Sequence, residues 1–345
     1  MVTLLLMTGC SATMKDEMFA LDTVISFNVY AKYEAECENF IKKSKKEIQR
    51  LEALLSAHDE DSDIYKINHS DGQPVKVSEE TAEIIRTALE VSKATDGAFD
   101  VSVYGLMNIW GFDTKNYRVP TDKEIQEALK KTGYENIEIT EDNFVTVKNG
   151  ATIDLGGIAK GYIVNKVISQ ADPSSNWNYH GCLINAGGMV MVVGDNMSRE
   201  DHRWIIGVEY PDSNGDYFAT FTGGDAVTAG AYQRYFEKDS KKYHHIIDPK
   251  TGAPCESDLS SVTVSGVYGA KADALSTAFY VMGKEKTLEF VKNYNQQTDE
   301  YNMIDVILLS KDKKDVYVTE NMLVRDFELE ESYKEKITVH AVNNK

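Results

Sequence analysis

Residues 243–252 read Tyr-His-His-Ile-Ile-Asp-Pro-Lys-Thr-Gly, and residues 272–278 read Ala-Asp-Ala-Leu-Ser-Thr-Ala. The first stretch is typical of a strand that ends in a turn, because Asp-Pro followed by Lys-Thr-Gly favours a turn. The second is typical of a helix, on which Asp273 and Thr277 are four residues apart and share one face, with about 6 Å between their β-carbons. Such a pair suits one hard cation, because magnesium takes one or two carboxylates and completes its shell with water and phosphates. We therefore expect a phosphate-bearing ligand.

Both stretches also have purely structural interpretations. A Thr four residues after an Asp is common on helices, where the pair caps an N-terminus or faces solvent. Asp248 either orients a neighbouring histidine or simply forms the turn before proline. Strand residues alternate between faces, so His244 and His245 should point in opposite directions, and at most one of them faces a given pocket.

The composition is that of an ordinary globular protein with an acidic balance. The chain has 345 residues, with 37 Lys and Arg against 55 Asp and Glu, which gives a formal charge of -18. This charge argues against a nucleic-acid partner, because a phosphate backbone needs a basic surface. An anionic ligand would need local help from a cation, a helix N-terminus or a glycine-rich turn.

The first ten residues read Met-Val-Thr-Leu-Leu-Leu-Met-Thr-Gly-Cys. This apolar run is too short to span a bilayer and resembles the end of a bacterial lipoprotein signal peptide. We expect residues 1–9 to be a signal-peptide remnant and residues 10–16 to be a lipidated Cys10 with a polar tether. The protein would then be extracytoplasmic and anchored to the cell membrane by lipid. The alternative is a hydrophobic terminus with no anchoring role. Cys37, Cys182 and Cys255 are too widely spaced to indicate a disulfide framework or a thiolate metal site.

Hydrophobic periodicity, caps and turn residues predict the order of elements. In the first half we expect a strand at 19–30, a helix at 34–55, a loop at 58–68, helices at 78–93 and from the Thr121–Glu124 capping box to Gly133, paired strands within 137–154 with a turn at Asn149-Gly150, and a helix at 157–169. In the second half we expect strands at 183–194, 204–210, 218–222, 243–247 and 261–267, helices at 271–282 and 284–294, and a hairpin of 303–310 with 316–319. This order favours an α+β fold over a doubly wound sheet. Residues 17–340 are expected to form one catalytic domain.

Three glycine turns can bring backbone N–H groups close to an anion. They read Asp-Leu-Gly-Gly-Ile-Ala-Lys-Gly at 154–161, Asn-Ala-Gly-Gly at 185–188 and Gly-Gly at 223–224. The first joins a strand to a helix, whose N-terminus offers free N–H groups and a favourable dipole. None has the spacing of a P-loop or a dinucleotide-binding fingerprint, so each is also explained as a tight turn. Lys160 either reaches a phosphate from the first turn or faces solvent.

Five ordered motifs carry a family resemblance. They are Asp-Gly-Ala-Phe-Asp-Val-Ser-Val at 96–103 followed by Trp-Gly-Phe at 110–112, Asp-Leu-Gly-Gly-Ile-Ala-Lys-Gly at 154–161, Ile-Asn-Ala-Gly-Gly at 184–188, and the two stretches at 243–252 and 272–278. Together they resemble the ApbE family of FAD:protein FMN transferases, over about residues 17–325. The resemblance implies a single ApbE-like α+β domain of mixed, largely antiparallel sheets with packed helices.

The resemblance further implies a magnesium-dependent enzyme that cleaves FAD, attaches FMN through a phosphoester bond to a threonine of a partner redox protein, and releases AMP. The acceptors in the family are flavin-carrying subunits of membrane redox complexes of the sodium-pumping quinone reductase (Nqr) or Rnf type, or other extracytoplasmic flavoproteins. Some members also hydrolyse FAD to FMN and AMP. A metal-dependent FAD pyrophosphatase and a non-catalytic FAD-binding lipoprotein are therefore the alternative functions.

Motif positions within the family imply site residues. The magnesium ion would be held by the Asp273 carboxylate, the Thr277 hydroxyl and the backbone carbonyl of Gly157. FAD contacts would fall on Leu21, Ser56, Ala57, His58, Asp100, Asp154, Lys160 and Ile247. For the base that deprotonates the acceptor threonine we choose His245, because of its motif position and because imidazole titrates near neutral pH. With Asp273 it makes up our catalytic pair.

The chain departs from the family pattern in three places. Leu21-Asp22-Thr23 stands where Met-Gly-Thr is usual, Ala229 replaces a serine, and Ser56-Ala57-His58 replaces Ser-Ser-Tyr or Ser-Thr-Tyr. Imidazole stacking by His58 would then replace an aromatic contact to FAD. We expect these changes to alter FAD affinity or the balance between transfer and hydrolysis, and to leave the metal pair intact.

Overall fold

The computed structural model describes residues 11–174, 176–213, 215–299 and 302–343. The predicted signal-peptide remnant and Cys10 lie outside the described residues. Among the helices of the described part, none is both long and apolar enough to cross a membrane.

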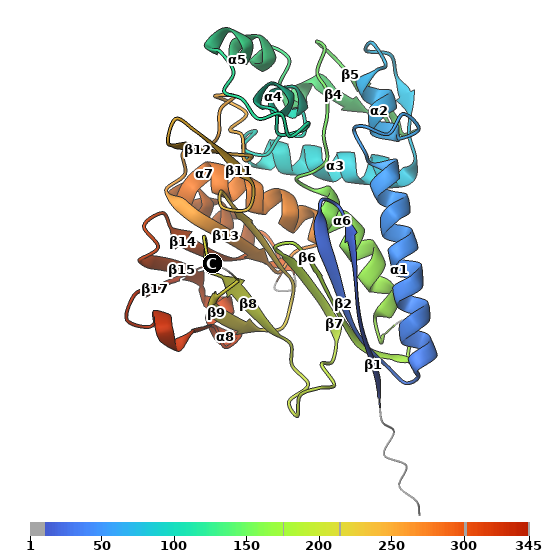
Figure 1. Ribbon diagram of the computed structural model, residues 1–345, viewed down its shortest axis with the longest axis vertical. Coiled ribbons are helices and arrows are strands. Elements are labelled where there is room, and N and C mark those ends of the chain that lie inside the picture. The colour runs from blue at the N-terminus through green and yellow to red at the C-terminus, as the bar shows by residue number, and fades with distance from the viewer. Residues whose placement is uncertain (1–10, 175, 214, 300–301, 344–345) are drawn as a thin grey trace, which may run out of the picture.

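A nine-stranded sheet forms the centre of the molecule (Figure 1). Every neighbouring pair is antiparallel except the last, β15 with β17, which is parallel. In sheet order, the strands are β1 (Ala12–Ala20), β2 (Thr23–Ala31), β6 (Tyr179–Ala186), β7 (Met189–Gly194), β10 (Ala226–Gly230), β13 (Leu259–Ser265), β14 (Asp305–Ser310), β15 (Asp315–Thr319) and β17 (Thr338–Val342). With its packed helices, this arrangement confirms the predicted α+β class with largely antiparallel sheets.

Helices cover one face of this sheet, and a small sheet covers the other. The long helices are α1 (Glu34–Leu54), α3 (Glu79–Ala94), α6 (Ala159–Ile168) and α7 (Gly269–Asn295). The small sheet consists of β8 (Ile205–Glu209), β9 (Tyr217–Thr222) and β16 (Glu328–Leu329). Strand β14 shows both contacts, because Val306 and Leu308 pack into the core on the helix side while Ile307 and Leu309 pack with the small sheet. The central strands are therefore buried on both faces.

The remaining elements gather beyond one end of the sheet, at the top of Figure 1. They are α2 (Asp63–Asn68), α4 (Tyr104–Trp110), α5 (Asp122–Leu129), and the sheet of β3 (Val75–Lys76), β4 (Ile137–Ile139) and β5 (Phe144–Val147). The hairpin of β11 (Tyr235–Lys238) and β12 (Lys241–His244) packs against α4, because Phe236 and Tyr243 share a small core with Trp110 and Phe112. The short helix α8 (Glu320–Val324) follows β15.

Helices α6 and α7 cross with their backbones in close contact. A β-carbon placed on Gly161 would lie 2.2 Å from the Gly269 carbonyl oxygen, and one on Gly269 would lie 2.7 Å from the Gly161 carbonyl oxygen. Only glycine permits this approach. It brings the first turn of α6 within hydrogen-bonding distance of Asp273 on α7, whose Oδ2 accepts the Gly161 N–H at 3.0 Å.

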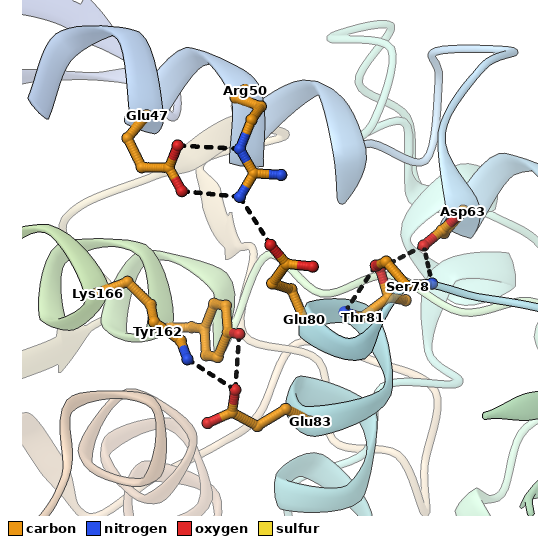
Figure 2. A network of polar contacts seen from close by, with 9 residues as sticks. All are labelled: Glu47, Arg50, Asp63, Ser78, Glu80, Thr81, Glu83, Tyr162 and Lys166. Atoms are coloured by element: carbon orange, nitrogen blue, oxygen red, sulfur yellow. Dashed lines mark hydrogen bonds and ion pairs between the residues drawn. The ribbon is translucent and has the colours of Figure 1, made fainter. Parts of the chain in front are cut away.

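A polar network joins α1, α3 and α6 (Figure 2). Arg50 of α1 bonds Glu80 of α3 at 2.8 Å and also Glu47 at 2.7 Å. Glu83 of α3 accepts from the Tyr162 hydroxyl and from Lys166 of α6, both at 2.9 Å. Tyr162 directly follows Gly161 and is fully buried, so the network fixes the rotation of α6 about its axis.

Asp63 makes a further set of contacts at the start of α3, with Ser78 and Thr81. Its Oδ2 accepts from the Ser78 N–H at 2.9 Å and from the Thr81 hydroxyl at 2.7 Å, as Figure 2 shows. The prediction of a loop at 58–68 is wrong for its second half, because residues 63–68 form helix α2. Its N-cap Ser62 accepts the Tyr65 N–H at 2.9 Å.

Two segments that were predicted as single strands belong to hairpins in the structure. The strand at 19–30 is replaced by β1 and β2, which are joined at Leu21 and Asp22 with φ of 54° and 58°. Residues 12–16, predicted as tether, therefore belong to β1. The strand at 183–194 divides at Gly187 and Gly188, with φ of 56° and 88°. In both cases the apolar alternation continues across the turn, so periodicity did not mark the break.

Three other boundaries also differ. Helix α5 has the predicted capping box but ends at Leu129, before Gly133. The β4–β5 turn lies at residues 140–143, and Asn149-Gly150 forms a separate turn after β5. Strand β12 ends at His244, three residues before the predicted end of its strand. The predicted pair of helices at 271–282 and 284–294 is confirmed, because Gly283, with φ 74°, interrupts α7.

Gly161→Ala tests the helix crossing. The added methyl group would meet the α7 backbone, so we expect a loss of about 1–3 kcal/mol in the free energy of unfolding. Gly105→Ala in α4 is the matched control, because its β-carbon meets its nearest atom at 3.8 Å. Chemical denaturation of the full chain measures both. Equal stabilities for the two variants would contradict the close crossing.

Candidate functional site

The α6–α7 crossing holds the predicted metal ligands. Asp273 is 5% exposed, and one of its oxygens caps the N-terminus of α6 through the Gly161 N–H. A β-carbon on Gly157 would lie 4.0 Å from the Thr277 hydroxyl, so the glycine turn before α6 lies beside the next turn of α7. The structure therefore brings Gly157, Asp273 and Thr277 together.

These groups fit a hard cation. In the described part of the chain, the Thr277 hydroxyl has no hydrogen-bond partner, and Asp273 keeps one carboxylate oxygen free of hydrogen bonds. No group of three or more His, Cys, Asp or Glu side chains in that part is placed to bind a metal. The donor set is thus one carboxylate with neutral oxygens, which leaves room for water and phosphate as magnesium prefers.

Charged side chains gather beside the glycine turn. Asp154 is half-buried, and its Oδ2 accepts the Gly156 N–H at 3.1 Å. Burial raises the pKa of Asp154, and nearby Asp113 raises it further, whereas the Gly156 N–H, His58 and Lys160 lower it. Lys160 itself lies 3.4 Å from the Gly156 carbonyl oxygen. Asp154, His58 and Lys160, all predicted FAD contacts, therefore belong to one electrostatic cluster.

His58 takes part in a second contact of this cluster. Its Nε2 lies 2.8 Å from Asp113 Oδ1, and the Tyr104 hydroxyl donates to Asp113 Oδ2 at 3.2 Å. The His58 and Tyr104 rings meet edge to face, with centroids 6.3 Å apart. The His58 side chain is nevertheless 62% exposed, so a flat ligand can still reach its ring.

His245 is held as a neutral imidazole. Its Nδ1–H donates to the Arg234 carbonyl at 3.1 Å. Burial, together with the neighbouring Arg234 and Lys160 charges, lowers the pKa of His245 to about 4. With Nδ1 carrying the proton, Nε2 keeps a lone pair that can accept one. Because the Lys160 charge acts on both Asp154 and His245, the histidine lies on the same side of the molecule as the glycine turn.

His244 is occupied differently. Its Nε2–H donates to the Cys255 carbonyl at 2.9 Å, and its ring meets Tyr280 edge to face. Burial lowers its pKa as well. The two adjacent histidines thus bond to different segments, as expected for residues that point in opposite directions.

The hairpin tip that carries Leu21 is tied to two other segments. The Leu21 N–H donates to Glu52 Oε1 at 2.6 Å. A β-carbon on Gly187 would lie 2.2 Å from the Thr23 hydroxyl oxygen, so the β6–β7 turn packs directly on the start of β2. Asp22 lies 3.8 Å from Lys115.

Four other predicted FAD contacts have structural partners. Ser56 Oγ accepts the N–H groups of His58 and Asp59 at 3.1 and 3.2 Å, and Ala57 is buried. Both oxygens of Asp100 accept backbone N–H groups, at 2.7 and 2.8 Å, although burial still raises its pKa. Ile247 is buried beside Trp110 and Phe112. Their roles as FAD contacts stay predictions.

The sequence analysis did not single out Asp113, Tyr104 or Arg234. Asp113 directly follows the Trp-Gly-Phe motif, which was the available signal. Arg234 donates to the Phe112 carbonyl and so links the β11 segment to the same motif. The pairing of Tyr104 and Asp113 with His58 depends on tertiary contacts that no local pattern indicates.

A cavity of about 420 Å³ lies elsewhere, lined by Asp225, Ser265, Tyr268, Arg325 and others. It opens at the C-terminal end of β13, and none of the predicted site residues lines it. Arg325 there donates to the Gly223 carbonyl and to the Ser265 hydroxyl, which are structural contacts.

The chain is similar in sequence to known proteins along most of its length. The sequence pattern of the ApbE family matches residues 21–301. A FAD:protein FMN transferase from Klebsiella pneumoniae (strain 342) is 31% identical over 292 residues, which cover 83% of this chain and 86% of that protein. One from Haemophilus influenzae is 30% identical over 260 residues, which cover 72% and 74%.

Two solved structures are similar to this chain throughout. The ApbE protein from Thermotoga maritima has a TM-score of 0.77 and 33% identity, and covers 95% of this chain and 100% of that one. The flavin transferase ApbE from Vibrio cholerae has a TM-score of 0.79 and 26% identity, and covers 92% and 100%. The matched residues 21–301 include Gly157, His245, Asp273 and Thr277.

Proposed function

The chain belongs to the ApbE family, and on that premise we propose that it transfers FMN from FAD to a threonine of a partner protein, with magnesium as cofactor. It is accordingly an enzyme of the transferase class. The observation that carries the proposal is the meeting of one carboxylate, one hydroxyl and one glycine turn at the α6–α7 crossing. The Lys160 charge next to this turn and the neutral His245 supply what else the reaction needs.

In the proposed reaction, the hydroxyl oxygen of the acceptor threonine attacks the FMN phosphorus of FAD. The bond from that phosphorus to the bridging oxygen breaks, and AMP leaves. Magnesium, when bound, neutralises pyrophosphate charge and stabilises the leaving group. Asp273, Thr277 and the Gly157 carbonyl would hold it. Lys160 and the N–H groups at the start of α6 favour the phosphates at the same turn.

His245 takes the acceptor proton in this proposal. The Arg234 carbonyl fixes the tautomer by accepting the Nδ1–H at 3.1 Å, which leaves the Nε2 lone pair for the threonine hydroxyl. Because burial keeps the ring neutral, the base is available throughout the physiological pH range. The proton passes from the imidazole to solvent after AMP departs.

Two alternative functions use the same site. A FAD pyrophosphatase needs only water as the nucleophile, and a non-catalytic lipoprotein would only bind FAD. Incubation of the full chain with FAD and magnesium, with and without a flavin-acceptor domain, separates the three. We expect AMP release that matches covalent FMN on the acceptor. Free FMN without acceptor would indicate the pyrophosphatase, and tight FAD retention without AMP would indicate the binding protein.

We further propose that the protein works outside the cytoplasm, anchored to the cell membrane by lipid at Cys10. Its acceptors would be flavin-carrying subunits of membrane redox complexes of the Nqr or Rnf type, or other extracytoplasmic flavoproteins. The support is the apolar run before Cys10 in the sequence. Anchoring would keep the site beside acceptors that lie in or on the same membrane.

Asp273→Ala is expected to abolish FAD cleavage, because it removes the charged ligand of the proposed cation. Thr277→Val should be milder and should raise the magnesium concentration needed for half-maximal rate, because only a neutral oxygen is lost. AMP release measured over a magnesium titration checks both. Ser276→Ala is the control, since its hydroxyl donates to the Asp273 carbonyl within the helix. Unchanged magnesium dependence in Asp273→Ala would refute the metal assignment.

His245→Ala should lower FMN transfer by roughly a hundredfold to ten-thousandfold with little change in FAD affinity. His244→Ala is the matched control and should affect transfer much less. The lowered pKa also sets the pH profile: protonation of His245 removes the base, so the rate should fall only as the pH approaches about 4. An acid limb near the ordinary imidazole value of about 6.5, or a large loss of FAD affinity, would argue against this role.

Cys10→Ser is expected to move the protein from the membrane fraction to the soluble fraction, without changing its activity on FAD and an isolated acceptor domain. Cys10 would carry two acyl chains, which are enough for stable anchoring, and the substitution removes their attachment site. Immunoblots of fractionated cells and mass spectrometry of the N-terminus measure the outcome. Wild-type protein recovered unmodified from the cytosol would contradict the anchor.

A further inference from the structure

Lys32, Tyr33 and Trp177 form an exposed cluster, here called the aromatic corner. Trp177 is 71% exposed and Tyr33 is 55% exposed, whereas the other tryptophans, Trp110 and Trp204, are 3% and 4% exposed. The Lys32 ammonium lies 4.4 Å from the Trp177 ring centroid and 5.4 Å from that of Tyr33. An indole left in water forgoes the large hydrophobic gain of burial, so this exposure calls for an occupant.

The aromatic corner lies where the N-terminal segment joins the domain. In the β1–β2 register, Ala12 pairs with Ala31. The next residue, Lys32, donates its N–H to the Asn178 carbonyl at 2.8 Å, which brings the Trp177 loop to the same place. Cys10 is two positions before Ala12 in the sequence, a span of at most about 7 Å. A group that holds Cys10 therefore lies near the corner.

The chemistry of the corner matches a lipid surface. Tryptophan and tyrosine have an apolar body with a polar tip and are enriched where hydrocarbon meets water. A lysine between them can keep its charge among headgroups while its stem lies along the rings. Glu34 follows directly at the exposed start of α1, so its charge offsets that of Lys32. Its binding energy would come from the rings.

We propose that the aromatic corner sits in the headgroup layer of the membrane and sets how the anchored domain stands on it. Strand β1 has nine residues, so it runs about 30 Å from the corner to the hairpin tip at Leu21. Figure 1 shows β1 and β2 extending from their lower end up toward α3 and α6. The corner at the membrane would hold the catalytic site roughly that far above the lipid. This inference rests on the proposed membrane placement and not on the transferase chemistry.

The test uses Trp177 as its own probe. The full chain is mixed with excess vesicles of phosphatidylethanolamine and phosphatidylglycerol, with plain or brominated acyl chains. We expect brominated lipid to quench the Trp177 part of the emission, which is obtained by subtracting the Trp177→Phe spectrum. Trp177→Ala combined with Tyr33→Ala should weaken vesicle binding of the Cys10→Ser chain by roughly fivefold to tenfold. Phe19→Ala, an exposed aromatic at the other end of β1, should not change it.

Three outcomes would overturn the inference. The first is absence of vesicle binding, and the second is binding without any change in Trp177 emission. The third is a Trp177 change produced by a flavin-acceptor domain in the absence of lipid, which would make the corner a protein-docking surface. FAD cleavage measured in the same samples keeps the two proposals separate. Quenching in a chain that does not cleave FAD would contradict the proposed function and leave the membrane contact standing.

Discussion

The close crossing of α6 and α7 is the constraint on which the site depends. Gly161 and Gly269 let the two backbones meet. The start of α6 therefore lies against Asp273 and Thr277 of α7. One Asp273 oxygen accepts the Gly161 N–H and so caps α6. This backbone hydrogen bond orients the carboxylate. The network through Glu83 and Tyr162 then prevents α6 from rotating. The proposed cation site has a single carboxylate, and it would require this rigidity because one charged ligand leaves little tolerance for misplacement.

The electrostatics reconcile an acidic protein with an anionic substrate. The chain carries a formal charge of -18, yet the Lys160 ammonium lies at the glycine turn, 3.4 Å from the Gly156 carbonyl oxygen. Burial also raises the pKa of Asp154 at this turn and lowers the pKa of His245. The Asp154 shift favours a neutral carboxyl group next to the turn and so reduces repulsion toward a pyrophosphate. Local placement of cations and helix N–H groups, rather than net charge, makes such a site compatible with phosphate.

Sequence patterns predicted local geometry better than the boundaries of the elements. The spacing of Asp273 and Thr277 was enough to place both on one helix face, because helix geometry is local. Gly283 likewise marked the break in α7. The turn at Leu21 and Asp22 was missed because it contains no glycine or proline, and because leucine rarely adopts a left-handed backbone. Asp113 and Arg234 were missed for a different reason: they join the site through contacts between segments far apart in the sequence, which local periodicity does not encode.

The tip of the β1–β2 hairpin has a strained backbone. A left-handed non-glycine residue costs roughly 1–3 kcal/mol, and here a leucine and an aspartate stand in sequence with φ of 54° and 58°. The turn persists because it is held from both sides, by the 2.6 Å bond from Leu21 to Glu52 and by the packing of Thr23 on Gly187. Natural chains keep local strain where the surrounding structure fixes a functional geometry. The β1–β2 hairpin thus has two specialised ends: the strained tip at Leu21 and Asp22, and the exposed aromatic corner next to Ala12 and Ala31.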